Sequence, residues 1–264
     1  LYIDLNNLTG YLPEFTFHLM LVSIPLIGLF LIDDLKGSKP GFRILIQCLL
    51  TVYMIFSTNV YLESLGDLFG FGNINLGIFS IPFTIFCVVG IMNAFNMIDG
   101  INGLCSGCAM LALLLIGFYS GLIYDSMLVL IIGSMIGFLL FNLGIFGKKR
   151  GVFLGDSGSN LIGFWVAWCA IYASQNQLYD IEPITMLWFV AIPFLDCIGL
   201  IFSRIKKGIS WNSPGRDHIH HKLMRNFSPR ITLLLILLIT SITGLFGIYI
   251  ENNSSPLTSL LLFL

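Results

Sequence analysis

The sequence predicts an all-α integral membrane fold, a polytopic bundle of transmembrane helices. Of its 264 residues, 56% are hydrophobic and only 10% are charged, whereas soluble domains average about 25% charged residues. Apolar runs of about 18 or more residues, enough to cross a bilayer, recur along the whole chain. The composition excludes a disordered chain, and the net charge of −1 argues against a nucleic-acid partner recognised by a basic surface.

Eight apolar segments are each long enough for a helix to cross a hydrocarbon core of ~30 Å, and we expect one crossing from each. They span residues 16–32, 42–60, 76–94, 104–123, 127–146, 158–174, 184–203 and 231–250.

The basic residues lie in three groups, all within or beside alternate connections between these segments. By the positive-inside rule these connections face the cytoplasm, and the opposite connections carry only acidic charges. The sequence therefore predicts a multi-pass protein whose polar chemistry lies on the cytoplasmic face. The groups are Lys36, Lys39 and Arg43; Lys148, Lys149 and Arg150; and Arg204, Lys206, Lys207, Arg216, Lys222, Arg225 and Arg230.

Residues 1–264 are predicted to form a single membrane domain. The chain begins at Leu1 and stops inside an apolar run, so we expect a fragment cut at both ends. The six cysteines lie in or beside apolar stretches, where they are interpreted as small hydrophobic residues rather than a disulfide framework.

Two adjacent aspartates, Asp33 and Asp34, end the first segment on the predicted inner side. Adjacent carboxylates suit a divalent cation or a general base, because their mutual repulsion raises one pKa. A solvated pair at a helix end is the plainer alternative.

A second polar cluster begins at the end of the third segment and continues beyond it, and it contains Asn93, Asn96, Asp99 and Asn102. If the helix continues through Gly103, polar residues recur every three to four positions, which places their amide and carboxylate oxygens on one helix face. Mg²⁺ prefers such oxygen ligands and usually keeps phosphate oxygens as partners. Amide hydrogen bonds between transmembrane helices are the alternative.

A glycine-punctuated loop from Gly151 to Asn160 leads into the sixth segment. Backbone N–H groups at such a helix start attract phosphate, and Asp156 within the loop is a natural metal ligand. An ordinary turn with Asp or Ser as the N-cap explains the same residues.

Three of the four histidines, His218, His220 and His221, follow Arg216 and Asp217 in the longest hydrophilic stretch. Together with the surrounding basic residues they favour recognition of an anion or a nucleotide phosphate over a zinc site. A basic loop attracted to acidic lipids is the alternative, and it leaves the histidines unexplained.

The four motifs together, in this order, resemble the polyprenyl-phosphate N-acetylhexosamine-1-phosphate transferases, most closely their WecA-type branch. The resemblance covers about residues 25 to 235 and is highly specific as a set. The matching stretches read IDDLKG, NAFNMIDGINGL, VFLGDSGSNLIGF and SPGRDHIHHKLM.

This resemblance implies a Mg²⁺-dependent enzyme of the bacterial inner membrane with a cytoplasmic-face active site; Mn²⁺ is an alternative metal. The phosphate of undecaprenyl phosphate attacks the β-phosphorus of a UDP-sugar, with UDP-N-acetylglucosamine favoured, and UMP leaves. The product is the lipid-linked first sugar of a cell-envelope polysaccharide. The partners implied are these two substrates, the bilayer and a second copy in a homodimer.

The resemblance also implies roles for individual residues. Asp156 is the principal metal ligand, Asn96 is the second, and Phe153 stacks on uracil. The catalytic set is Asp33, Asp34 and Asp99, of which the first two engage the lipid phosphate. The remaining substrate-binding residues are Lys36, Asn93, Asn102, Arg216, Asp217, His218, His220 and His221.

Three features depart from the family pattern. Many bacterial relatives have a second aspartate where this chain has Asn102, and Lys36 lies one position earlier than in the MraY branch. We also expect the stretch that begins at Leu1 to lack the family's first helices.

Three other hypotheses stay open. Carboxylates and histidines in a helical bundle also suit a cation- or proton-coupled transporter, and the same motifs suit a transferase that uses the UDP form of another N-acetylhexosamine. Asn102 and the missing first helices suggest a binding protein of this family without activity.

Overall fold

The computed structural model describes residues 14–37, 39–147, 149, 151–176, 181–210 and 217–264. Within these ranges the fold is helical, and the β-pairing is an isolated bridge between Ser64 and Asn75. The helices are α2 (Glu14–Lys36), α3 (Pro40–Thr58), α4 (Ser80–Ile98), α5 (Leu104–Ser120), α6 (Ser126–Asn142), α7 (Gly155–Gln175), α8 (Pro183–Phe189), α9 (Ala191–Lys206), α10 (Ile219–Leu223), α11 (Pro229–Asn253) and α12 (Pro256–Phe263), with 3₁₀ turns η1 (Gly77–Phe79) and η2 (Leu122–Tyr124).

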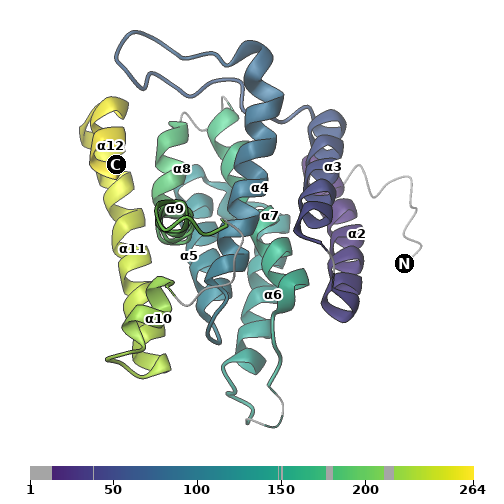
Figure 1. Cartoon of the computed structure of the whole chain (residues 1–264). Coiled ribbons are helices and arrows are strands. Elements are labelled where there is room, and N and C mark those ends of the chain that lie inside the picture. The colour runs from purple at the N-terminus through teal and green to yellow at the C-terminus, as the bar shows by residue number, and fades with distance from the viewer. Residues whose placement is uncertain (1–13, 38, 148, 150, 177–180, 211–216) are drawn as a thin grey trace.

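Helices α4 and α7 form the centre of the bundle, and α2, α3, α5 and α9 pack around them (Figure 1). Gly163 of α7 lies directly on the backbone of α4, where a Cβ atom would come within 2.7 Å of the Cα of Met92. This close approach lets Phe95, Phe164 and Trp168 pack in a core from which solvent is fully excluded.

The outward faces of the bundle carry large apolar side chains, among them Ile24, Phe56, Phe86 and Leu234. Such continuous apolar surface is typical of helices that face lipid. Four helical stretches of the described residues are long and apolar enough to cross a membrane: Glu14–Lys36, Pro40–Thr58, Gly77–Ile98 and Pro229–Asn253. The predicted all-α, polytopic membrane fold is confirmed.

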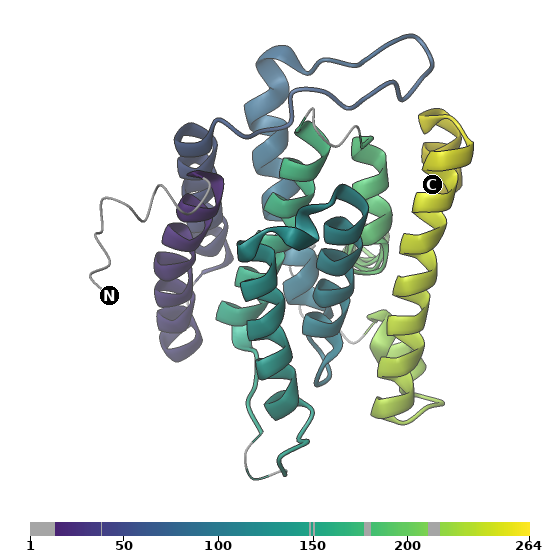
Figure 2. The same cartoon turned by 180° about the vertical axis from the view of Figure 1, so that it is seen from behind.

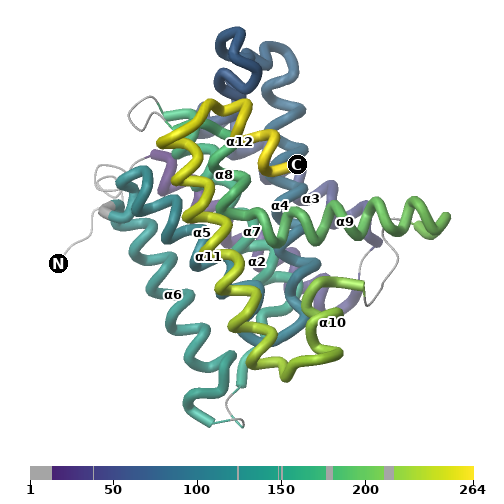
Figure 3. Tube along the Cα trace, turned by 90° about the vertical axis from the view of Figure 1, so that its left-hand side faces the viewer, coloured from purple at the N-terminus to yellow at the C-terminus, as the bar shows by residue number. Residues whose placement is uncertain are grey.

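The expectation of eight simple crossings needs correction. Helices α5 and α6 have 17 residues each and are shorter than the other crossings. The seventh segment is two helices, α8 and α9, which meet at an angle of 85°. Pro193 explains the break, because it has no N–H to donate and its ring would clash with the carbonyl of Phe189 in a straight helix. Helix α9 then runs across the direction of the bundle (Figure 3).

The predicted inner ends of successive helices meet in one half of the bundle. The end of α2, the starts of α3 and α7 and the connection between α4 and α5 lie there together, with α10 beside them (Figure 2). The long connection between α3 and α4 lies at the opposite end (Figure 1). The charge pattern anticipates this arrangement, because the described residues of the first basic group, Lys36, Lys39 and Arg43, lie where α2 ends and α3 begins.

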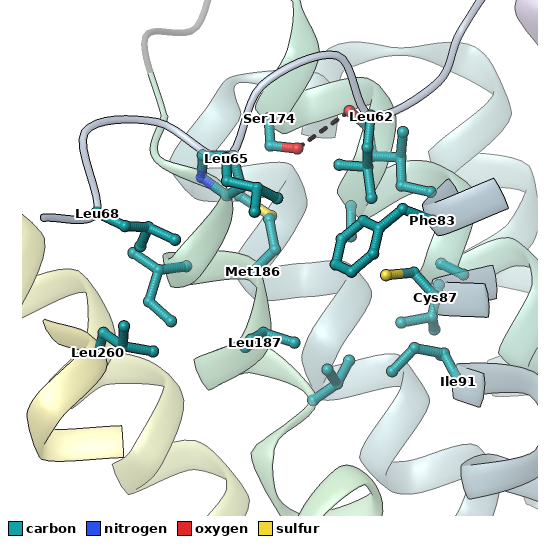
Figure 4. Close-up of a pocket in the computed structure, with 17 residues that line it drawn as sticks. Leu62, Leu65, Leu68, Phe83, Cys87, Ile91, Ser174, Met186, Leu187 and Leu260 are labelled. Carbon is teal, nitrogen blue, oxygen red and sulfur yellow. Dashed lines mark hydrogen bonds between the residues drawn. The ribbon is translucent and has the colours of Figure 1, made fainter. Parts of the chain in front are cut away.

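The opposite half contains an apolar cavity of about 210 Å³, shown in Figure 4. The hydroxyl of Ser174 in its wall donates a hydrogen bond to the carbonyl of Ile171 at 3.2 Å. The other labelled side chains in Figure 4 are those of Leu62, Leu65, Leu68, Phe83, Cys87, Ile91, Met186, Leu187 and Leu260. The cavity therefore offers hydrocarbon surface and lies away from the polar end of the bundle.

Candidate active site

An arginine joins two of the predicted site aspartates. Arg43, near the start of α3, places Nε 2.6 Å from Oδ2 of Asp33 and donates from Nη1 to Oδ2 of Asp156 at 2.6 Å. Asp33 is buried at the end of α2, and Asp156 lies half-buried in the first turn of α7. One positive charge therefore holds two carboxylates that are far apart in the sequence.

Asp34 binds the start of α7 through the helix backbone. Its Oδ1 accepts from the N–H of Asp156 at 3.1 Å, and its Oδ2 accepts from the N–H of Ser157 at 3.2 Å. Gly155 makes the turn with φ +68°, a backbone conformation that disfavours other residues. The N–H groups at this helix start therefore face the carboxylate of Asp34, and the binding of a phosphate there stays a prediction.

Asn96 lies beside Asp156, so the two predicted metal ligands are neighbours. The Asn96 Nδ2 donates to Oδ1 of Asp156 at 3.0 Å and to Oγ of Ser159 at 2.9 Å. These contacts link the last turn of α4 to the first turn of α7.

A chain of amides fixes the helices behind these residues. Asn93 donates to Oε1 of Gln47 at 2.9 Å, and Gln47 donates to Oδ1 of Asn160 at 2.6 Å. Asn160 in turn donates to the backbone carbonyl of Asp156 at 2.7 Å. Gln47 and Asn160 are buried, and their polar atoms are paired, which sets the register of α3, α4 and α7.

The predicted continuous polar face from Asn93 to Gly103 is wrong beyond Asn96. Helix α4 ends at Ile98, and Gly103 has φ +82°, so the chain turns between the two helices. Asp99 lies in this turn. Burial, together with the smaller effect of the nearby charge of Asp156, raises the pKa of Asp99 to about 6.

The histidines approach this turn from α10. The ring of His220 is 1% exposed and lies so close to Gly100 that a Cβ atom has no room there. Ring centroids lie 5.3 Å apart for His218 and His220, and 4.2 Å apart for His220 and His221. Burial and the two neighbouring imidazoles lower the pKa of His220 to about 4, so this ring is neutral at pH 7.

A cavity of about 700 Å³, here called the amphipathic cavity, opens between α2, α3, α4 and α9. One part of its wall is polar and includes Arg43, Asn93, Asn96 and His218. The rest is largely apolar and includes Phe30, Ile44, Ile85, Phe86, Val89 and Ile201. A molecule with a charged head and a hydrocarbon tail matches this division.

Other predicted site residues lie at the edge of the cluster or outside it. Lys36, Asn102 and Phe153 are exposed, and Phe153 is 82% exposed. Asp217 is exposed and forms an ion pair of 3.2 Å with Lys207, which lowers the pKa of Asp217. Arg216 lies outside the described residues.

Three further residues, Arg43, Gln47 and Asn142, contribute to the site and were not predicted from the sequence pattern. Asn142 accepts from the N–H of Gly103 at 2.6 Å and donates to the carbonyl of Val152 at 2.7 Å, which joins two connections of the site. A signal was present, because ionisable and amide residues within apolar helices are usually functional or paired. Gln47 also follows Arg43 by four residues, on the same helix face.

All six cysteines lie in described residues and are free, as predicted. Within the described part of the chain, no three His, Cys, Asp or Glu side chains form a ready metal site. A metal there would depend on fewer protein ligands and on substrate oxygens.

Comparison with known proteins identifies the family. The sequence profile of glycosyl transferase family 4 matches residues 16–174, more than half of the chain. The chain is 35% identical over 248 residues to the undecaprenyl-phosphate alpha-N-acetylglucosaminyl 1-phosphate transferase of Escherichia coli K12, covering 92% of this chain and 67% of that protein. The Haemophilus influenzae enzyme of the same name is 36% identical over 257 residues, covering 92% and 72%.

A third relative of the same name, from Yersinia pestis, is 36% identical over 249 residues and is covered over 67% of its length. The order of the four motifs and the cluster they form agree with these matches, and the predicted family is confirmed. This multi-pass membrane protein belongs to glycosyl transferase family 4.

Proposed function

We propose that this protein transfers N-acetylglucosamine 1-phosphate from UDP-N-acetylglucosamine to undecaprenyl phosphate and releases UMP. The names of its relatives support the substrates. The observation that carries the proposal is the meeting of Arg43, Asn96 and Asp156 beside the amphipathic cavity. Charged and hydrocarbon substrates can meet there at the edge of a membrane.

The amphipathic cavity suits the lipid substrate. Its apolar wall, with Phe86 and Ile201, would hold the first isoprene units, while the rest of the tail extends into the bilayer. Arg43 is placed to bind the lipid phosphate, because charge-assisted hydrogen bonds to phosphate are short and strong. The positive-inside rule supports placing this site on the cytoplasmic face.

The donor set fits a magnesium ion. Asp156 and Asn96 would hold it, since Mg²⁺ is commonly bound by one or two protein groups together with substrate phosphates. The oxygen and nitrogen of an amide such as Asn96 are assigned from the hydrogen-bond network, so its oxygen can face a cation instead. When bound, the ion would neutralise charge on the pyrophosphate of the nucleotide sugar.

The remaining residues would arrange the transfer. An oxygen of the lipid phosphate forms a bond to the β-phosphorus while the bond from that phosphorus to the UMP oxygen breaks, and UMP carries the electron pair away. Asp33 is held by Arg43 and Asp34 by the start of α7, which favours positioning roles for both. Phe153, exposed before α7, is available to stack on uracil.

Replacing the carboxylate at the centre of the cluster tests the proposal. Asp156→Asn keeps the shape but removes the charge, so transfer of radiolabelled sugar phosphate to undecaprenyl phosphate should fall by about 100-fold or more. Glu63→Gln, at the opposite end of the bundle, is the matched control and should retain activity. Full activity in Asp156→Asn, with normal membrane insertion, would contradict the site.

A further inference from the structure

Asp196 of α9 makes two hydrogen bonds to the start of the histidine segment. Its Oδ2 lies 2.8 Å from Nδ1 of His218, and its Oδ1 accepts from the backbone N–H of Ile219 at 2.8 Å. The side chains of Asp196 and His218 are only 8% and 11% exposed. Both carboxylate oxygens are therefore committed to two adjacent residues in a largely water-excluded position.

These two bonds determine how His218 is oriented. An ionised carboxylate only accepts hydrogen bonds, so Nδ1 of the imidazole must carry a proton and donate it toward Asp196. The bond to the backbone of Ile219 also fixes the point where α10 begins, so one carboxylate holds both the ring of His218 and the start of the helix that follows it. The other ring nitrogen, Nε2, is left for a ligand.

His218 lines the amphipathic cavity together with Arg43 and Asn96. Asp196 does not line this cavity, and it belongs to a groove on the other side of α9 with Leu195, Ser203 and Lys222. The carboxylate of Asp196 thus holds the imidazole of His218 from the side of the ring that lies away from the cavity.

We propose that Asp196 is a positioning residue, which orients His218 so that Nε2 faces a phosphate in the amphipathic cavity. In the imidazolium form of the ring, Nδ1–H donates to Asp196 and Nε2–H donates to a phosphate oxygen. This inference rests on the proposed function for the identity of the phosphate. It also explains why α9 bends across the bundle: the bend brings Asp196 under the histidine segment while Ile201, on the same helix, lines the wall of the cavity.

The first test replaces the carboxylate by an amide of equal size. Asp196→Asn has one acceptor oxygen for two donors, so kcat/KM should fall by about 10- to 100-fold, the range expected for a lost hydrogen bond to a charged group. Ser203→Ala, two turns further along α9, is the matched control and should stay within about twofold of wild type. Unchanged activity in Asp196→Asn would overturn the proposal.

A double-mutant cycle separates positioning from general support of the fold. If Asp196 acts through His218, the double variant Asp196→Asn/His218→Ala should be no slower than His218→Ala alone. Multiplied losses in the double variant would mean that the carboxylate acts elsewhere, and would overturn the proposal.

A spectroscopic readout keeps this inference distinct from the proposed function. In protein labelled with ¹⁵N-histidine, the Nδ1 signal that disappears in His218→Gln should shift in Asp196→Asn, whether or not the enzyme turns over. If wild-type protein transfers no sugar phosphate, the proposed function fails. If the His218 signal does not move, the positioning role fails.

Discussion

Arg43 shows how much of the site depends on one side chain. It lies against a buried carboxylate, Asp33, and a half-exposed one, Asp156, from two other helices. The contact with Asp33 is a close ion pair rather than a well-aligned hydrogen bond. The sequence predicts both aspartates as site residues, but Arg43 only as part of a basic loop, because side-chain partners 10 and 113 positions apart are decided by helix packing.

Removing Arg43 should leave the charge of Asp33 buried without compensation. Arg43→Met is expected to lower the free energy of unfolding by about 2–3 kcal/mol, less than for a fully buried pair because Arg43 is partly exposed. Chemical unfolding in detergent measures this loss.

A second substitution checks the cause of that loss. Arg43→Met/Asp33→Asn should regain most of the stability, because no unpaired charge remains, while transfer activity stays low. An equal loss of stability in the double variant would show that Arg43 stabilises the fold mainly through Asp156 or through packing.

At the scale of elements, Asn142 joins the connection after α4 to the connection before α7. Its side chain accepts from Gly103 and donates to Val152, and both partners are backbone groups. The sequence predicts both connections as site loops. It does not predict the link, because Asn142 lies at the end of an apolar segment and its two partners belong to different loops.

Asn142→Asp tests this link. The new carboxylate can still accept from the N–H of Gly103, but its other oxygen would face the carbonyl oxygen of Val152, and two acceptors cannot form a hydrogen bond. This change should lower the free energy of unfolding by about 1–3 kcal/mol. Transfer activity should fall with it, because the loop before Asp156 is released. Ser134→Ala on the same helix is the control; a stable, fully active Asn142→Asp protein would exclude this role.

The break between α8 and α9 is also decided at this scale. Hydropathy predicts one crossing over residues 184–203, since both halves are apolar. Pro193 marks a place where the helix can kink, but the direction of α9 depends on its packing against α4 and on the contacts of Asp196. The angle of 85° therefore could not be predicted from periodicity.

For the whole molecule, the charge distribution predicts which end of the bundle faces the cytoplasm. Phe71, in the connection between α3 and α4, and Arg225, after α10, are exposed at opposite ends. In a variant lacking the six native cysteines, Phe71→Cys should react in spheroplasts with a membrane-impermeant maleimide. Arg225→Cys should react only after the membrane is opened. The reverse labelling pattern would refute the predicted orientation.

The sequence by itself determined the membrane fold, the alternation of its loops and the family to which the chain belongs, and it predicted several of the polar side chains that meet in the cluster. These follow from local properties, since hydropathy and charge act on each segment without reference to the others. The tertiary structure alone decided the pairing of Arg43 with two aspartates, the capping of α7 by Asp34, the bend before α9 and the support of His218 by Asp196. Each of these depends on the distance between groups on different helices, which packing sets and a linear pattern does not contain.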